Sequence, residues 1–152
     1  MVNEFDHEVL ELASLLNDID SKANAKVIQA TDSILYEAQV NFKPFLGGID
    51  WAKAVLVAST EPQVNERLNE QRNRILREFD RFVVELKFDE DDIAIVISDD
   101  FYSGGIQCRI KSVTTVLDKW IGLPHAILVF DESFRKCFHV SFLGCTYMGH
   151  AV

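Results

Sequence analysis

Five consecutive apolar residues, Ile93 to Ile97, have carboxylates on both sides. A short apolar run bounded by turn-forming residues is typical of a buried strand. The acids form two groups, which are Asp89, Glu90, Asp91 and Asp92 before the run and Asp99 and Asp100 after it. The pattern therefore predicts a buried strand with carboxylates at each end.

Two aromatic residues, Phe101 and Tyr102, follow the second acidic group and precede Gly104 and Gly105. Residues 87–105 hold six acids and one base, which is more acid than turns require. Aromatic side chains on exposed loops are typical interface anchors. We therefore expect a partner-binding surface formed by Asp89, Glu90, Asp91, Asp92, Asp99, Asp100, Phe101 and Tyr102. An alternative stays open, in which the acids only solubilise the surface and Phe101 is tucked into a hairpin turn.

Length and charge limit the class of protein. The 152 residues are 48% hydrophobic and include eleven Phe, which suffices for the core of one domain spanning residues 1–152. The formal net charge is −9. The arginines between Arg72 and Arg81 alternate with acids and resemble a solvated helix face, so we expect no nucleic-acid binding. An acidic surface also disfavours anionic membranes and favours a basic protein partner.

Cysteine usage indicates a compartment. The chain has three cysteines, Cys108, Cys137 and Cys145, and no secretory signal or apolar run long enough for a membrane span. An odd cysteine count in that context predicts reduced thiols and a cytoplasmic protein.

The first half of the chain has helical periodicity. Phe5, Val9, Leu12 and Leu16 recur at helical spacing. A second helix is expected from Ser21 to about Phe42, and a third from the capping pattern Thr60-Glu61-Pro62-Gln63 to about Leu86, with Leu68, Ile75, Phe79 and Phe82 on the core. Residues 51–59 fit either a helix or a strand.

The second half predicts four strands, at residues 93–97, 106–110, 126–130 and 137–143, with a helix at residues 113–121. The C-terminal tail, residues 146–152, either extends the last strand or packs on the sheet. Segregated helices and strands with short connections predict an α+β fold, in which N-terminal helices pack on a C-terminal, mainly antiparallel four-stranded sheet with one inserted helix.

Three kinds of catalytic or metal chemistry are weakly indicated. Cys137 and His139 share one face of a strand, and Cys108, Cys145 and His150 could complete a metal site. A cysteine nucleophile could use His125, His139 and Asp131. The paired carboxylates could serve a hydrolase or hold Mg²⁺. None of these sets has a recognised ligand spacing or nucleophile motif, so we expect no cofactor, no metal and no enzyme activity.

In charge, size and layout, the chain resembles small bacterial immunity proteins that neutralise a cytotoxic nuclease domain. That resemblance implies a non-enzymatic inhibitor that caps the active site of a basic, nuclease-type toxin, and it implies a monomer. It identifies no functional residue. The alternatives are an acidic secretion chaperone or adaptor acting as a homodimer, which the absence of early strands counts against, and a small hydrolase using carboxylates or Cys/His.

Overall fold

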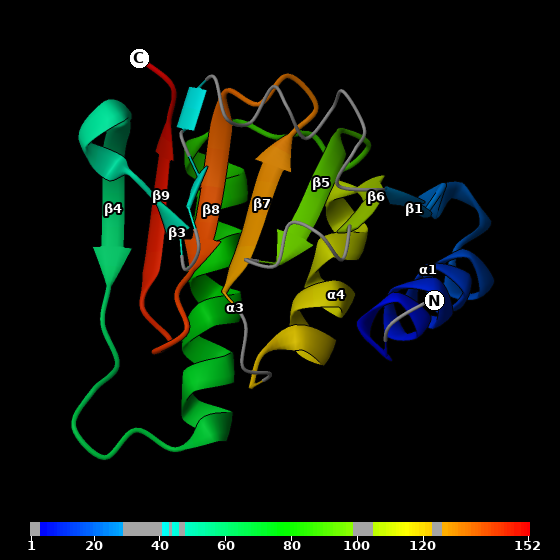
Figure 1. The fold of residues 1–152 in the computed structure, drawn as a ribbon, viewed down its shortest axis with the longest axis horizontal. Coiled ribbons are helices and arrows are strands. Elements are labelled where there is room, and N and C mark those ends of the chain that lie inside the picture. Colours follow the sequence, from blue (N-terminus) through cyan, green and yellow to red (C-terminus); the bar gives the residue numbers. More distant parts are fainter. Residues whose placement is uncertain (1–3, 29–40, 43, 46–47, 99–104, 123–125) are drawn as a thin grey trace.

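The computed structural model describes residues 4–28, 41–42, 44–45, 48–98, 105–122 and 126–152. The described residues form three α-helices, α1 (Glu4–Ile19), α3 (Leu68–Glu85) and α4 (Val113–Trp120). They also form the strands β1 (Lys26–Ile28), β4 (Val55–Thr60), β5 (Ile93–Ser98), β6 (Gly105–Arg109), β7 (Ile127–Asp131), β8 (Lys136–Val140) and β9 (Thr146–His150). These seven strands make one antiparallel sheet in the order β1-β6-β5-β7-β8-β9-β4 (Figure 1). The fold class is α+β, which confirms the prediction.

Strand β5 lies inside this sheet, between β6 and β7. Successive side chains of a strand point to opposite faces. Ala94 and Val96 join the hydrophobic cluster that includes the helices, whereas Ile95 and Ile97 join a second cluster on the other face. Because both faces of β5 are buried, the strand is apolar at every position from Ile93 to Ile97.

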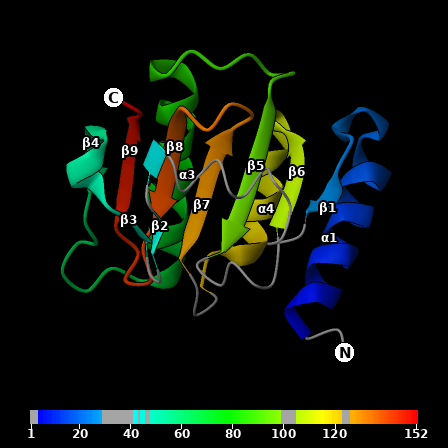
Figure 2. The same ribbon diagram turned by 45° about the horizontal axis from the view of Figure 1, so that its top comes forward.

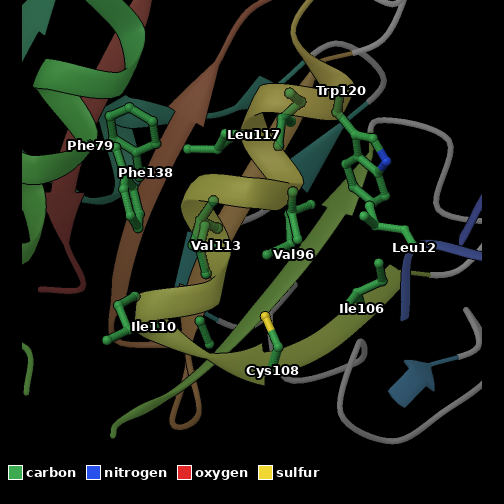
Figure 3. Packing of buried hydrophobic residues seen from close by; sticks show 14 of the residues in the cluster. Leu12, Phe79, Val96, Ile106, Cys108, Ile110, Val113, Leu117, Trp120 and Phe138 are labelled. Carbon is green, nitrogen blue, oxygen red and sulfur yellow. The ribbon is translucent and has the colours of Figure 1, made fainter. Parts of the chain in front are cut away.

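One face of the sheet is covered by α3 and α4, with α1 beside β1 and β6 (Figures 1 and 2). Its core holds Phe79 and Phe82 of α3, whose rings pack against Phe138 of β8 at centroid distances of 5.6 and 5.5 Å. Leu117 and Trp120 of α4 continue this core toward α1 (Figure 3).

The opposite face is covered by residues from the first third of the chain. Phe42 packs on Phe130 of β7 at 5.4 Å and on Trp51 at 6.3 Å. Ile49 belongs to the same cluster. It ends the strand pair formed by β2 (Pro44–Phe45) and β3 (Gly48–Ile49). The sheet is therefore buried on both sides over its centre.

The prediction of four strands was wrong in number. The four predicted strands correspond to β5, β6, β7 and β8, and the described sheet has three more, β1, β4 and β9. Strands β1 and β4 precede residue 91. The prediction that early strands are absent, which counted against a secretion chaperone, was therefore also wrong. The C-terminal tail forms β9, which pairs with β8 through Cys137 and Gly149 and with β4 through Leu56 and Gly149.

The predicted helix from Ser21 to Phe42 is not present as such. A single 3-10 turn, Ser21–Ala23, ends at Asn24, whose φ of 49° reverses the chain. The Asn17 side chain accepts from the Ala25 amide at 2.8 Å and donates to the Ala25 carbonyl at 2.9 Å. These bonds direct the chain into β1 instead of a helix. Of the remainder of that prediction, residues 41–42 are helical and residues 29–40 lie outside the described residues.

The helix predicted to begin at Thr60 begins at Leu68. Thr60 instead ends β4, and its hydroxyl pairs with the Thr146 hydroxyl of β9 at 2.6 Å. Leu68 is 52% exposed and does not belong to the core, whereas Ile75, Phe79 and Phe82 are buried as expected. Tertiary pairing with β9 therefore overrides the local capping pattern.

The sequence of residues 51–59 fits either a helix or a strand, and the structure contains a short helical turn followed by a strand. Asp50 accepts from the Ala52 amide at 3.1 Å and caps a 3-10 turn, Trp51–Lys53. Strand β4 follows at the edge of the sheet, with Val55, Leu56 and Val57 each 41–44% exposed. Among the described helices, none has the length and apolar character needed to cross a membrane.

Candidate partner-binding site

The first acidic group lies at the start of β5. Asp89–Asp92 form the turn between α3 and β5, and Ser98 ends the strand. A six-residue strand is about 20 Å long, so these ends are well separated. The other predicted site residues, Asp99, Asp100, Phe101 and Tyr102, lie outside the described residues.

Asp92 has a structural role in the α3–β5 turn. Its carboxylate accepts from the Asp89 amide at 2.8 Å, and its own amide donates to the Asp89 carbonyl at 3.0 Å. Its carbonyl accepts from the Ile110 amide at 2.7 Å, which fixes the turn to the end of β6. Asp side chains commonly close turns in this way, so this part of the acidic pattern follows from turn chemistry.

The other three acids of the turn are exposed to solvent. Asp91 pairs with Arg109 of β6 at 2.8 Å, although its side chain remains 74% exposed. The carboxylates of Asp89 and Glu90 make no hydrogen bond or ion pair with any residue that the structure describes. Exposed ion pairs contribute little to stability. Asp89 and Glu90 are therefore not explained by contacts within the described part of the chain.

The β7–β8 hairpin brings two further acids to the same end of the central strands. Ala94 of β5 pairs with Asp131 of β7, which places Asp131 beside the start of β5. A hollow of about 460 Å³ separates the two turns and is lined by Phe88, Asp92, Ile93, Asp131, Glu132, Ser133 and Lys136. We call Asp89, Glu90, Asp91, Asp92, Asp131 and Glu132 the acidic edge. The sequence prediction did not include Asp131 and Glu132 in this set. Aligning β5 and β7 as antiparallel neighbours would have placed them there.

Asp131 and Glu132 have different roles. The Asp131 carboxylate accepts from the amides of Arg135 and Lys136 at 2.7 and 2.8 Å and from the Ser133 hydroxyl at 2.6 Å. Glu132 is exposed, and its carboxylate contacts no described residue by a hydrogen bond or ion pair. Asp131 therefore shapes the hairpin, and Glu132 is available to a partner.

The hollow already holds one cation. Lys136 places its ammonium 4.6 Å from the centre of the Phe88 ring, within the range of a cation–π contact. Four basic residues, Lys87, Arg109, Arg135 and Lys136, belong to or contact these turns, so the edge is mixed in charge with a modest acidic excess. The exposed carboxylates of these two turns are those of Asp89, Glu90, Asp91 and Glu132, and Glu132 lines the hollow beside Phe88.

The three cysteines form no disulfide, and two of them, Cys108 and Cys137, are buried. Cys108 belongs to the cluster on the helical face and Cys137 to the cluster on the opposite face, so the sheet separates them. Burial raises the pKa of the Cys108 thiol to about 12. Burial, and then the charge of Asp131, raise the pKa of the Cys137 thiol well above its usual value. Both side chains are therefore thiols at neutral pH, whereas a nucleophile must be a thiolate.

His139 packs against an aromatic residue of the neighbouring strand. Its ring stacks on Tyr147 of β9, with centroids 5.2 Å apart, and it is buried. Within the described ranges, no three His, Cys, Asp or Glu side chains are arranged to hold a metal ion. Cys137 and His139 are both buried, and Cys137 belongs to the apolar cluster on the face opposite the helices.

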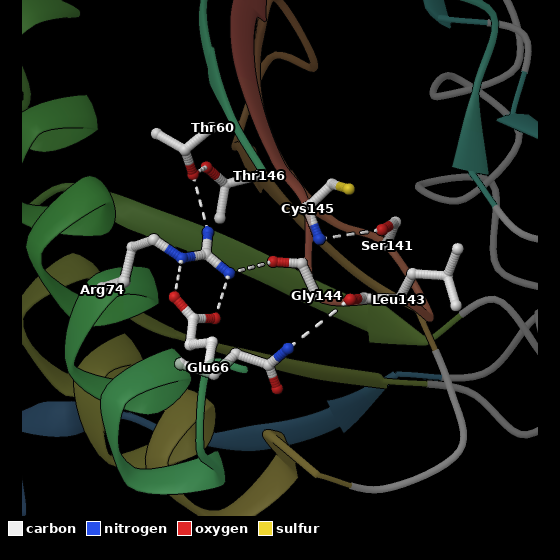
Figure 4. Close-up of polar contacts among 9 residues, drawn as sticks. Thr60, Glu66, Arg74, Ser141, Leu143, Gly144, Cys145 and Thr146 are labelled. Carbon is white, nitrogen blue, oxygen red and sulfur yellow. Dashed lines mark hydrogen bonds and ion pairs between the residues drawn. The ribbon is translucent and has the colours of Figure 1, made fainter. Parts of the chain in front are cut away.

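A buried ion pair joins α3 to the loop that precedes it (Figure 4). Arg74 donates two hydrogen bonds to the Glu66 carboxylate, at 2.9 and 3.0 Å, and the two side chains are 8% and 4% exposed. Those bonds hold the pKa of Glu66 below its ordinary value. The sequence had placed Arg74 on a solvated helix face, which was wrong for this residue, because its donors also reach Thr60 and Gly144.

Comparison with known proteins adds no relative to this picture. The chain matches no model of a known protein family and no curated protein.

Proposed function

We propose that the protein is a non-enzymatic binding protein whose acidic edge contacts a basic protein partner. The observation that carries this proposal is the set of three exposed carboxylates, on Asp89, Glu90 and Glu132, that bond to none of the residues the structure describes. They sit on two hydrogen-bonded turns, so a partner would meet them in a fixed arrangement. The net charge of −9 would steer a basic partner toward the protein.

The most concrete partner is a nuclease-type toxin domain, and the protein would then be an immunity protein. A nuclease binds phosphates with basic side chains, so carboxylates at matching positions can occupy its active site in place of the substrate. The hollow around Phe88 adds an apolar contact beside the charges. Asp99, Asp100, Phe101 and Tyr102 remain part of the proposed contact, as the sequence predicts.

A test of this proposal compares matched charge reversals. Partner capture comes first. Equilibrium binding of the purified partner is then measured for the wild type, for Asp89→Lys/Glu90→Lys, and for Glu70→Lys/Asp80→Lys on α3, where both acids are exposed. The edge variant should weaken binding at least about tenfold, and the α3 variant, which changes the net charge equally, should weaken it less. A partner that is itself acidic, or equal losses in the two variants, would refute a specific role for the edge.

A second candidate is the homodimeric secretion chaperone or adaptor. The exposed edge strand β4 favours it, because Val55, Leu56 and Val57 present apolar side chains on a strand that pairs with β9 alone among the described strands. A register shift between Leu56 and Ala58 interrupts this edge, which limits continuous pairing with a second β4. Light scattering after gel filtration separates the candidates, since a dimer that Val57→Lys dissociates would favour the chaperone.

A further inference from the structure

A groove between α1 and α4 lies outside the proposed acidic edge. Its volume is about 330 Å³, and its lining is formed by Glu8, Glu11, Leu12, Leu15, Lys119 and Trp120. Leu12 and Trp120 form the floor, because they are 6% and 3% exposed and pack together in the core (Figure 3). The groove therefore has an apolar floor that is continuous with the core.

The apolar surface extends along α1 beyond this floor. Leu15 is 38% exposed and Ile19, one turn further along, is 67% exposed. Side chains three and four positions apart lie on the same side of a helix, so Leu12, Leu15 and Ile19 form one stripe that passes from the core into solvent. Such a stripe favours an apolar partner surface running parallel to α1.

The α1 side of the groove is acidic, and α4 contributes one base, Lys119, to the lining. Residues 1–21 contain six acids and no base. Two of these acids, Glu8 and Glu11, line the groove, and neither makes an ion pair with a described residue. A second copy that packed its α1 against this α1 would bring the same acids against each other, which disfavours that form of self-association. A cationic segment would complement them.

We propose that the α1–α4 groove binds an amphipathic, cationic helical segment of another protein. Its apolar side chains would pack on Leu15, Ile19 and Trp120, and its Lys or Arg side chains would reach Glu8 and Glu11, as in other helix-in-groove complexes. The site is separate from the acidic edge. The 3-10 turn that leads into α4 is bonded to Asp92, whereas Trp120 lies at the far end of α4, about 12 Å along the helix.

The test uses a synthetic probe, so it does not depend on the partner of the acidic edge. In a Trp51→Phe background, Trp120 is the single tryptophan of the chain. This protein is titrated with a 14-residue helical peptide of Leu and Lys, and with the same peptide carrying Glu in place of Lys. The Lys peptide should give a saturable change in Trp120 emission and a heat of binding, whereas the Glu peptide should give neither.

Three variants locate the binding. Glu8→Lys/Glu11→Lys should weaken the Lys peptide at least about tenfold, and Ile19→Gln, on an exposed side chain, should weaken it about threefold or more. The matched control, Asp89→Lys/Glu90→Lys, changes the net charge equally on the acidic edge and should stay within about twofold. Thermal unfolding of each variant confirms an intact fold.

Several results would overturn the groove proposal while leaving the acidic edge untouched. The first is that both charge reversals weaken binding of the Lys peptide equally. The second is that the Glu peptide binds as tightly as the Lys peptide. The third is that Trp120 emission does not change when the Lys peptide is added. A dimer that Ile19→Gln dissociates would show that a second copy occupies the groove instead.

Discussion

Arg74 on α3 donates a hydrogen bond of 2.6 Å to the backbone carbonyl of Gly144, in the turn between β8 and β9. The same guanidinium bonds Glu66 and the Thr60 hydroxyl at the end of β4. One side chain therefore ties the helical layer to the two strands at one side of the sheet, including the edge strand.

The Arg74–Glu66 pair predicts a pH-dependent stability. The pKa of Glu66 is lowered in the folded protein from an ordinary value of 4.5, so its contribution is complete above about pH 4.5 and is lost as pH falls through the lower folded value. Glu66→Gln should reduce the free energy of unfolding by about 1–3 kcal/mol at pH 7. Urea unfolding of both proteins from pH 7 to pH 3 should show this gap shrinking at the acidic end. A gap of constant size would contradict the assignment.

Phe79 should be one of the most costly side chains to truncate. It is 1% exposed and packs on Phe82 and Phe138. Phe79→Ala should cost about 3–5 kcal/mol in chemical denaturation. Val84→Ala on the same helix is the control, because Val84 is 76% exposed and should change stability by less than about 0.5 kcal/mol. A loss below about 1 kcal/mol for Phe79→Ala would place that side chain outside the core.

Adjacent acids in the β7–β8 hairpin should behave differently. Asp131→Ala removes an acceptor from the amides of Arg135 and Lys136 and should cost about 1–3 kcal/mol of stability. Glu132→Ala should leave stability within about 0.5 kcal/mol and act only on partner binding. Equal stability losses in thermal unfolding would show that Glu132 also belongs to the fold.

The three cysteines should differ in reactivity. Cys108 and Cys137 are fully buried, and burial raises the pKa of each thiol, whereas Cys145 is half-buried. In the native protein, a maleimide should therefore modify Cys145 first, and the other two should react only after unfolding. Mass spectrometry after timed labelling measures this order. Early labelling of Cys137, or two cysteines that resist labelling in denaturant without reductant, would contradict it.

Short-range patterns predicted a substantial part of the fold. The apolar run at Ile93–Ile97 and the helical spacing of Ile75, Phe79 and Phe82 identified β5 and the core of α3, because burial of these side chains follows local periodicity. Strand β1 is only three residues long and is held by pairing with Ile106 and Gln107, some eighty residues away. The local propensity of three residues does not indicate pairing with a distant strand, so β1 was not predicted.

The sequence also predicted only part of the candidate site, because some of its residues come together only through long-range strand pairing. Consecutive acids in one segment, such as Asp89 and Glu90, are visible in the sequence. The proximity of Asp131 and Glu132 depends on the register of β5 against β7, and the burial of Arg74 depends on a turn seventy residues away. Sequence spacing also could not separate acids that close turns, such as Asp92, from acids left exposed.

The most direct test of the central claim is the association rate of the purified partner with the wild type and with Asp89→Lys/Glu90→Lys, measured across a salt series. Steering by the acidic edge predicts that wild-type association slows as salt rises. It also predicts that the variant associates more slowly at low salt and depends less on salt, while its folded stability is unchanged. The same comparison extends to Asp99→Lys/Asp100→Lys. Association that is indifferent to salt and to both charge reversals would contradict the account.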